Sequence, residues 1–268
     1  MRPFNFSEIE DQEWLPGEFR NMITELLKYH ISDMFKIYDS VVPKIIRILQ
    51  YTGESQIVDL CSGASGPWPL MVKYLKPNLK VVLTDRYPNL KAWSEIASKS
   101  HGRITYVDQP VDAMCIPEDL KGLRTLFTGF HHFKPEAAKE ILKKAVQQNQ
   151  PIAVFEFTGR KFSNMLGMFW SPLLVYLSTP FVKPKKMERF LWTYIVPVIP
   201  FLYWWDGIVS NLNTYSPEEL KSMVNEIDSD GYKWEIGTET SREPFFTITY
   251  LIGYREKNVD ELVKRGQG

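Results

Sequence analysis

Two aspartates frame the part of this sequence that could bind a nucleoside. The stretch VDLCSGASG at 58–66 runs from an apolar strand through Asp59 into a turn of small residues, and Asp85 follows the apolar run at 80–84. A carboxylate at a strand tip can accept both hydrogen bonds from a ribose diol. An acid beside the turn repels phosphate and suits a cation. The pattern therefore favours a ligand with an adenosine end and a cationic amino-acid end.

Two other nucleotide-binding motifs fit this turn less well. A P-loop requires a lysine after its last glycine to meet the phosphates, but Pro67 follows Gly66. A dinucleotide fingerprint requires three glycines in the pattern GxGxxG, and this turn contains only Gly63 and Gly66. The P-loop is therefore excluded, and dinucleotide binding is poorly supported.

The surrounding segments alternate between strand and helix patterns. Short apolar runs rich in β-branched residues predict strands at 56–61, 80–85, 103–108, 123–130 and 151–157, and a final pair at 232–239 and 245–255. Helical spacing is found within 1–53 and at 69–76, 134–148 and 216–227. This alternation predicts a parallel sheet that is covered on both faces.

The ordered set of segments resembles the class I S-adenosylmethionine-dependent methyltransferases. The matching segments are VDLCSGASG (58–66), LTDRYPN (83–89), VDAMCIP (111–117) and GFHHFKPEAAKEIL (129–142). The resemblance implies an α/β, Rossmann-like, doubly wound seven-stranded sheet. It is mostly parallel with an antiparallel last strand, and it carries N-terminal helices and a helical insertion after the fifth strand. Cys61 and Ser65 stand where many family members have glycine.

The resemblance also implies S-adenosyl-L-methionine as cofactor and assigns its contacts. Asp59, Ser62, Gly63 and Gly66 are expected at the methionine end, and Asp85 at the ribose. Asp112, Ala113 and Met114 are expected at the adenine, and Arg86 and Phe130 complete the cofactor-binding set. The alternative for the two glycines is an ordinary turn, and for Asp112 a helix cap or a surface acid.

Methyl transfer from a sulfonium relies on alignment and exclusion of water, so a base is optional. The candidate bases are His131 and His132, which follow the fourth predicted strand, and Glu156, near the end of the fifth. Adjacent residues of an extended chain point in different directions, so one histidine is expected to face the pocket. Alternatively, both histidines are structural, and Glu156 pairs with Arg160.

The segment after the fourth predicted strand limits the class of acceptor that we expect. Family members that methylate exocyclic or amide nitrogens commonly carry an [ND]PP[YF] motif there, and those that methylate RNA ribose carry a Lys-Asp-Lys-Glu set. This chain has GFHH at 129–132 instead. We therefore expect a methyltransferase acting on the oxygen or carbon of a small, largely apolar or aromatic acceptor. A catalytically silent cofactor-binding regulatory protein is the alternative from another class.

The insertion at 160–210 is rich in aromatic residues and is expected to decide the substrate. Trp170, Tyr176, Phe181, Trp192, Tyr194, Phe201, Tyr203, Trp204 and Trp205 are predicted to form a hydrophobic lid over the open edge of the sheet. A membrane-surface hairpin through 164–205 is the rival, because the basic KPKKMER at 183–189 joins two uncharged runs. That reading makes a lipid or quinone-like acceptor the alternative substrate. A homodimer interface or ordinary core is a further alternative for the insertion. Asp206 in WWDG is expected to be a turn acid, with a place in the pocket as the alternative.

Composition sets the remaining limits. The 32 basic and 32 acidic residues cancel, so nucleic acid is not an expected partner. Cys61 and Cys115 are widely separated, which argues against a disulfide framework, and no metal site is predicted. The opening residues lack a secretion signal, so we expect a cytoplasmic protein, peripheral to the membrane under the hairpin alternative. The predicted divisions are a helical cap (1–53), a cofactor-binding core (54–159), a lid (160–210), the end of the core (211–256) and a charged tail (257–268).

Overall fold

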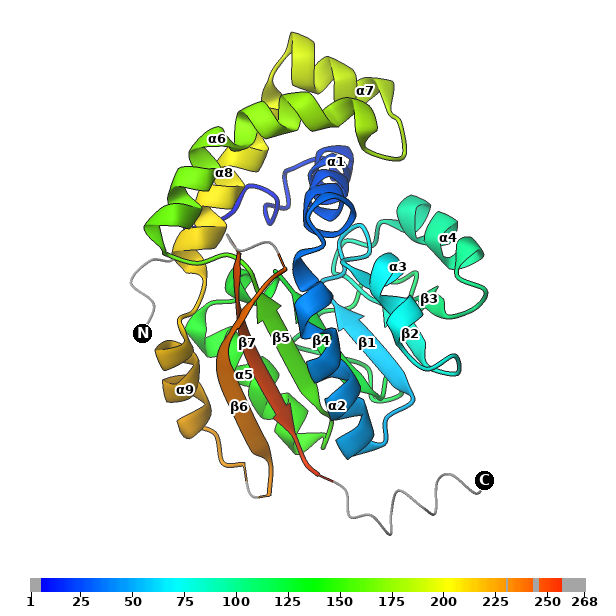
Figure 1. The fold of residues 1–268 in the computed structure, drawn as a ribbon, viewed down its shortest axis with the longest axis vertical. Helices are drawn as coiled ribbons and strands as arrows, with labels where there is room; N and C mark the ends of the chain where they lie inside the picture. The colour runs from blue at the N-terminus through cyan, green and yellow to red at the C-terminus, as the bar shows by residue number, and fades with distance from the viewer. Residues whose placement is uncertain (1–5, 230, 243–245, 257–268) are drawn as a thin grey trace.

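A single mixed sheet organises the chain. The computed structural model describes residues 6–229, 231–242 and 246–256 (Figure 1), so the predicted tail at 257–268 lies outside the described residues. The strands are β1 (Gln56–Leu60), β2 (Lys80–Leu83), β3 (Ile104–Tyr106), β4 (Leu123–Phe127), β5 (Ile152–Glu156), β6 (Lys233–Thr240) and β7 (Thr247–Tyr254), in the order β3-β2-β1-β4-β5-β7-β6. Strands β1 to β5 are parallel, and β7 is antiparallel to β5 and β6. The predicted α/β Rossmann-like fold is confirmed.

Helices cover both faces of this sheet, as the buried strands require. The helices are α1 (Gly17–Lys28), α2 (Val42–Thr52), α3 (Trp68–Met71), α4 (Leu90–Lys99), α5 (Pro135–Gln147), α6 (Phe162–Ser178), α7 (Met187–Phe190), α8 (Val198–Asn213) and α9 (Pro217–Asn225). Ile57 of β1 packs in one core cluster with Trp68 and Trp93, whereas its neighbour Val58 packs in a second cluster with Ile141 of α5. Alternate strand residues therefore supply two separate cores.

Local signals explain most helix ends. Gly53 adopts a φ of 64° and ends α2, as predicted, because glycine tolerates this left-handed conformation. Ser216 and Glu219 form a capping box at the start of α9. The sequence analysis did not predict α4, although the Asn89 side chain accepts a hydrogen bond from the Ala92 backbone N–H at its start.

The inserted helices form an arm, which we define as residues 162–213; it contains α6, α7, the π-helical turn Leu191–Ile195, α8 and the connections between them (Figure 1). Helices α6 and α8 pack against each other, and α1 packs beneath α8. Helix α8 continues past residue 210, the predicted end of the insertion, and contains Asp206. The prediction of a turn at Asp206 is therefore wrong, because the apolar run on both sides continues one helix.

No single helix among the described residues is both long and apolar enough to cross a membrane. Within the described part of the chain, one pair of helical segments, Met187–Ile195 and Val198–Asn213, reaches that length and composition jointly, and it bends by 80° between its two parts.

Buried polar contacts tie the arm to the N-terminal helices. His30 Nδ1 lies 2.9 Å from the Tyr203 hydroxyl, and His30 Nε2 lies 2.8 Å from Ser178 Oγ. Glu25 of α1 accepts hydrogen bonds from Lys186 Nζ, at 2.8 Å, and from Arg189. Since Arg189 is 0% exposed and Glu25 is 2% exposed, this pair is shielded from solvent screening.

Replacing Glu25 with alanine is expected to destabilise the fold by about 3–5 kcal/mol, because it leaves the buried Arg189 guanidinium without its carboxylate. Urea unfolding followed by circular dichroism measures the change. The matched control is Lys28→Ala, which breaks the more exposed Lys28–Asp33 ion pair and should cost less than about 1 kcal/mol. Equal losses in the two variants would contradict the buried role of Glu25.

Candidate active site

A cavity of about 410 Å³ lies at the carboxyl ends of the central strands. Strands β2 and β4 lie on opposite sides of β1 in the sheet. The strand order therefore reverses at this point, and open α/β sheets bind ligands at such a topological switch point. Nearly all the predicted cofactor residues line this one cavity: Asp59, Ser62, Gly63, Gly66, Asp85, Arg86, Asp112, Ala113 and Met114. Side chains of α1, among them Arg20 and Thr24, close it from the other side.

Phe130 is the member of the predicted set that does not line the cavity. It is buried in the core beside α5 and α9, with its ring centroid 5.7 Å from that of Tyr215. The chain forms a tight 3₁₀ turn over Phe130–His132, and this turn directs the Phe130 side chain into the core. Phe130 contributes to the site through its backbone N–H, which donates to Glu156.

Asp59 holds the turn after β1 in place. Its Oδ1 accepts a hydrogen bond from Thr125 Oγ1 and its Oδ2 accepts one from Ser62 Oγ, both at 2.7 Å. Its side chain is almost fully buried, and burial raises the pKa of Asp59 to about 7. Asp59 lies at the cavity wall, but its hydrogen bonds serve the shape of the turn.

The turn itself adopts conformations that favour glycine. Gly63 and Gly66 have φ values of 51° and 53°, and Cys61 and Ser65 have values of 56° and 129°. Left-handed backbone is sterically unfavourable for residues with a Cβ. Cys61 and Ser65 therefore accept strained conformations at the two positions where many class I methyltransferases have glycine.

Asp85 connects the second motif to this turn. Its Oδ2 accepts from the Gly63 N–H and its Oδ1 accepts from the Tyr87 N–H, both at 2.8 Å. Burial raises the pKa of Asp85 above its ordinary value. A carboxylate oxygen that accepts one hydrogen bond retains a second lone pair, so Asp85 can still receive hydrogen bonds from a ligand in the cavity.

Asp112 shapes the third segment. Its Oδ1 accepts from the Met114 N–H at 2.8 Å, and its backbone carbonyl accepts from the Cys115 N–H at 2.8 Å. These bonds form a tight turn that presents Ala113 and Met114 to the cavity. The turn is anchored to the second motif because the Val111 N–H donates to the Asp85 carbonyl at 2.9 Å.

A second, smaller cavity adjoins the first and shares Glu10, Leu27, Thr128 and His132 with it. Its other walls include Glu8 from the N-terminal segment, Met168 from α6, and Tyr203, Asp206 and Ser210 from α8. Of the aromatic residues predicted to form a lid, Tyr203 alone lines either cavity. The predicted aromatic lid is therefore wrong in its detail, because α6 and α8 turn most of their aromatic side chains outward.

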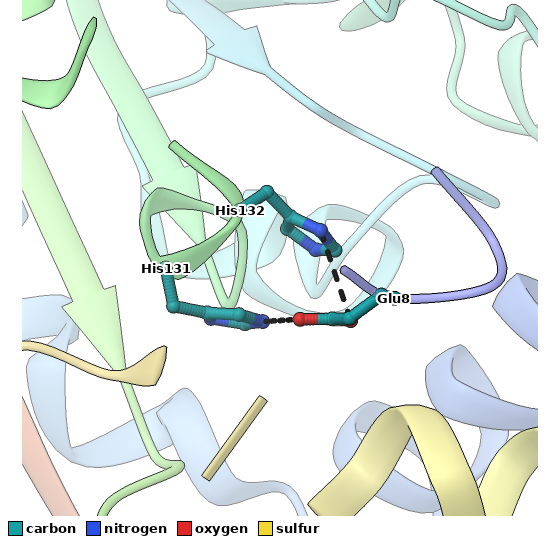
Figure 2. A group of neighbouring side chains, drawn as sticks. All are labelled: Glu8, His131 and His132. Atoms are coloured by element: carbon teal, nitrogen blue, oxygen red, sulfur yellow. Dashed lines mark ion pairs between the residues drawn. The ribbon is translucent and has the colours of Figure 1, made fainter. Parts of the chain in front are cut away.

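The two candidate histidines point the same way. Figure 2 shows both imidazoles directed towards Glu8, and the ring centroids are 4.4 Å apart in a stacked arrangement. The expectation that they diverge is wrong, because the 3₁₀ turn Phe130–His132 replaces an extended chain. His131 lines only the smaller cavity, whereas His132 lines both.

Glu156 holds the 3₁₀ turn Phe130–His132 in place through hydrogen bonds. Its Oε2 lies 2.7 Å from His131 Nδ1, and its Oε1 accepts from the Phe130 N–H at 2.7 Å and the Gly129 N–H at 3.1 Å. Arg160, the alternative partner, pairs with Glu219 instead. Because Glu156 lines neither cavity, we assign it a positioning role.

The charges around the two imidazoles keep them protonated. Burial opposes the cationic form, but the carboxylates of Glu156 and Glu8 raise the pKa of His131 to about 9. Burial likewise opposes protonation of His132, yet Asp11, at 2.8 Å, and Glu8 raise its pKa well above 6.5. Both histidines are therefore cationic at neutral pH and are poor general bases.

Glu10 is a carboxyl at the junction of the two cavities whose pKa lies closer to neutral than that of His131, so it can release its proton at mildly alkaline pH. It lines both cavities, and burial raises its pKa to about 8 against the opposing charge of His132. Its Oε2 has no hydrogen-bond partner among the described residues. Sequence reasoning missed Glu10 because it lies in the N-terminal segment; the acidic run EIEDQE at 8–13 was the available signal.

Asp206 anchors Glu10. Its two carboxylate oxygens accept from the Ile9 N–H at 2.6 Å and the Glu10 N–H at 3.1 Å. Burial raises the pKa of Asp206 to about 7. The N-terminal segment therefore depends on α8 for its position over the cavities.

Among the described residues, one group of side chains could hold a metal ion, although no metal site was predicted from the sequence. Ligand atoms of Glu8, His131 and His132 lie within 4.8 Å of one another (Figure 2). Glu8 Oε1 is 3.4 Å from His131 Nε2, and Glu8 Oε2 is 3.7 Å from His132 Nδ1. These ion pairs also account for the arrangement by charge attraction alone.

No protein-family model matches this sequence, and no curated protein is significantly similar to it. Among solved structures, the chain is similar to a Rhodobacter sphaeroides protein described as a candidate Zn-dependent alcohol dehydrogenase, at 13% identity and a TM-score of 0.51, over 89% of this chain and 98% of that chain. It is similar to the mitomycin 7-O-methyltransferase MmcR at 13% identity and a TM-score of 0.50, over 89% of this chain and 60% of MmcR.

The O-methyltransferase NcsB1 of neocarzinostatin biosynthesis, solved with S-adenosylmethionine and a naphthoic acid, is similar at 13% identity and a TM-score of 0.50. That similarity covers 85% of this chain and 55% of NcsB1. At such identities the similarity concerns the fold. Together with the strand order and the antiparallel β7, it shows that this chain has the fold of the class I S-adenosylmethionine-dependent methyltransferases.

Proposed function

We propose that this chain is an S-adenosylmethionine-dependent methyltransferase that acts on the oxygen or carbon of a small, largely apolar acceptor. The observation that carries the proposal is the convergence of three separate segments on one cavity. These are the turn at 62–66, the tip at Asp85 and the segment 112–114. Their order and their place at the switch point agree with the fold.

The residues around the cavity fit the cofactor. Its volume of about 410 Å³ falls within the roughly 300–1,000 Å³ typical of small-ligand sites. Asp85 and Asp112 bring carboxylates to the cavity wall, where they could receive the hydroxyl and ammonium groups of the cofactor, while Arg20, Arg86 and Lys134 supply positive charge to the same wall. Asp85 would hold the ribose, and segment 112–114 would flank the adenine. The bound cofactor would supply an electrophilic methyl group.

A dinucleotide, as the dehydrogenase description of one neighbour suggests, is less well supported. The turn lacks the third glycine of GxGxxG, which allows the backbone to approach a pyrophosphate. The Asp85 carboxylate, which accepts from the Gly63 N–H, would also repel a pyrophosphate beside that turn. The names of MmcR and NcsB1 instead describe methylation at oxygen of small molecules, which supports an oxygen acceptor here.

The acceptor would lie where the two cavities meet, against Leu27, Thr128, Glu10 and His132. Glu10 Oε2 would take the proton of an acceptor hydroxyl, since its pKa of about 8 is close to that expected for a general base at neutral pH. The cationic His132 would attract the developing oxyanion. Burial of this junction by α1 and the arm would exclude water.

The Asp85→Ala variant is expected to bind S-adenosylhomocysteine at least about tenfold more weakly, because hydrogen bonds to a charged group contribute about 1.5–3 kcal/mol. Isothermal titration calorimetry measures the dissociation constant. Asp108→Ala, which changes an exposed aspartate outside the cavity, is the matched control and should bind like the wild type. Unchanged affinity in Asp85→Ala would rule out this cofactor site.

The Glu10→Gln variant is expected to lower kcat about 10²–10⁴-fold, the range for loss of a general base, while S-adenosylhomocysteine still binds. Wild-type activity should rise with pH as the Glu10 carboxyl, with its pKa of about 8, loses its proton, and the variant should lose this dependence.

Transfer of labelled methyl groups to a panel of phenols and hydroxyaromatic acids measures that activity. The control Glu18→Gln changes an exposed glutamate of α1 and should keep the wild-type profile. Cofactor binding without transfer to any acceptor would favour the catalytically silent alternative, and an unchanged pH profile in Glu10→Gln would exclude Glu10 as the base.

A further inference from the structure

The arm carries most of the exposed large apolar side chains of the described residues. They are Phe162, Leu166, Phe169, Trp170, Leu173, Leu177, Phe181, Met187, Leu191, Tyr194, Ile195, Val196, Phe201 and Trp205. Phe162 is 82% exposed and Ile195 is 74% exposed. Elsewhere such residues are scattered singly along the chain, as at Trp14, Tyr51 and Tyr74. A concentration of exposed large apolar side chains in one segment is typical of an interaction site.

Helix α6 exposes a stripe of large apolar side chains. Its exposed residues Phe162, Leu166, Phe169, Leu173 and Leu177 recur every three or four positions, so they form one stripe. Its buried residues are Ser171, Val175 and Ser178. A helix of a water-surrounded protein normally buries its apolar stripe. Here the largest apolar side chains face outward while two serines and Val175 face the protein, so no described residue covers the outward stripe.

The charges of the arm indicate which kind of partner would contact its exposed apolar side chains. Lys183 and Lys185 are exposed between Phe181 and Met187, whereas Lys186 and Arg189 turn inward to Glu25. Glu188 is the one acidic residue between positions 162 and 205. The exposed surface of the arm therefore combines apolar side chains with two lysines, and this combination complements a bilayer with anionic headgroups. A second copy of the arm would offer the two lysines only one carboxylate.

The dimensions favour a surface position over a span. At about 1.5 Å per residue, the 17 residues of α6 extend roughly 26 Å, less than the hydrocarbon core of about 30 Å. Helix α6 also contains Pro172, and the candidate pair of Met187–Ile195 and Val198–Asn213 is bent by 80°. Trp170, Tyr194 and Trp205 have the amphipathic rings that are enriched at membrane interfaces.

We propose that the outer face of the arm docks on an anionic lipid bilayer and lies in the interface without crossing it. The inner faces of the same helices, through Met168 and Tyr203, line the smaller cavity. Docking would therefore set the acceptor end of the site close to the lipid. This inference concerns binding to a membrane and does not depend on the proposed methyl transfer.

Flotation of the full chain with phosphatidylcholine vesicles, with and without phosphatidylserine, tests the proposal. The wild type is expected to float, and to do so more completely with phosphatidylserine. Phe169→Ser combined with Leu173→Ser should reduce partitioning at least tenfold on both vesicles. Lys183→Gln combined with Lys185→Gln should reduce only the part that depends on phosphatidylserine, by about fivefold per lysine, since each basic residue contributes about 1 kcal/mol.

The changed residues are exposed, so circular dichroism and the melting temperature should match those of the wild type. Tyr74→Ser and Lys80→Gln, at exposed positions outside the arm, are matched controls and should float like the wild type. A wild-type chain that stays unbound to both vesicles would overturn the proposal. So would a lipid-free dimer, seen by light scattering, that becomes monomeric in the Phe169→Ser, Leu173→Ser variant, because a second copy would then cover this face.

Discussion

The buried carboxylate of Asp59 is the constraint on which the site depends. Asp59 and Thr125 are register partners on β1 and β4, the two strands on either side of the switch point. Burial makes an unpaired carboxylate costly, so its oxygens require the hydroxyls of Thr125 and Ser62. Those bonds fix the turn that carries Gly63, and Gly63 in turn donates to Asp85. Asp59 thus links β1 and β4 directly, and the tip of β2 through Gly63 and Asp85, and these bonds set the shape of the cavity.

A similar arrangement supports the acceptor end. Glu156, at the end of β5, gathers the backbone N–H groups of the 3₁₀ turn after β4 and orients His131. The two cationic histidines then hold the acidic N-terminal segment over the smaller cavity. Asp206 of α8 accepts hydrogen bonds from backbone N–H groups of the same segment. The arm and the turn after β4 therefore both contact the segment that carries Glu10. The proposed base is thus positioned by α8 of the arm and by the turn after β4.

The arm explains why apolar composition alone was ambiguous. A run of aromatic and aliphatic residues can cover a pocket, span a bilayer or lie on one. Its inner side packs Val175 and Ile199 against Met22 and Leu26 of α1 and adds buried polar pairs, His30 with Tyr203 and Glu25 with Arg189. The many large apolar side chains that remain exposed on the arm distinguish it from the hydrophobic lid that composition suggested.

Sequence periodicity determined the strands, the late antiparallel pair and the acids at the strand tips, because these depend on local alternation and on motif order. It also identified the turn at 58–66, where close backbone packing restricts residue type. Only the tertiary structure decided that Phe130 enters the core, that His131 and His132 stack, and that Glu8 and Glu10 reach them. These outcomes depend on contacts between distant segments, Glu10 with His132 and Asp206 above all, which no local pattern encodes.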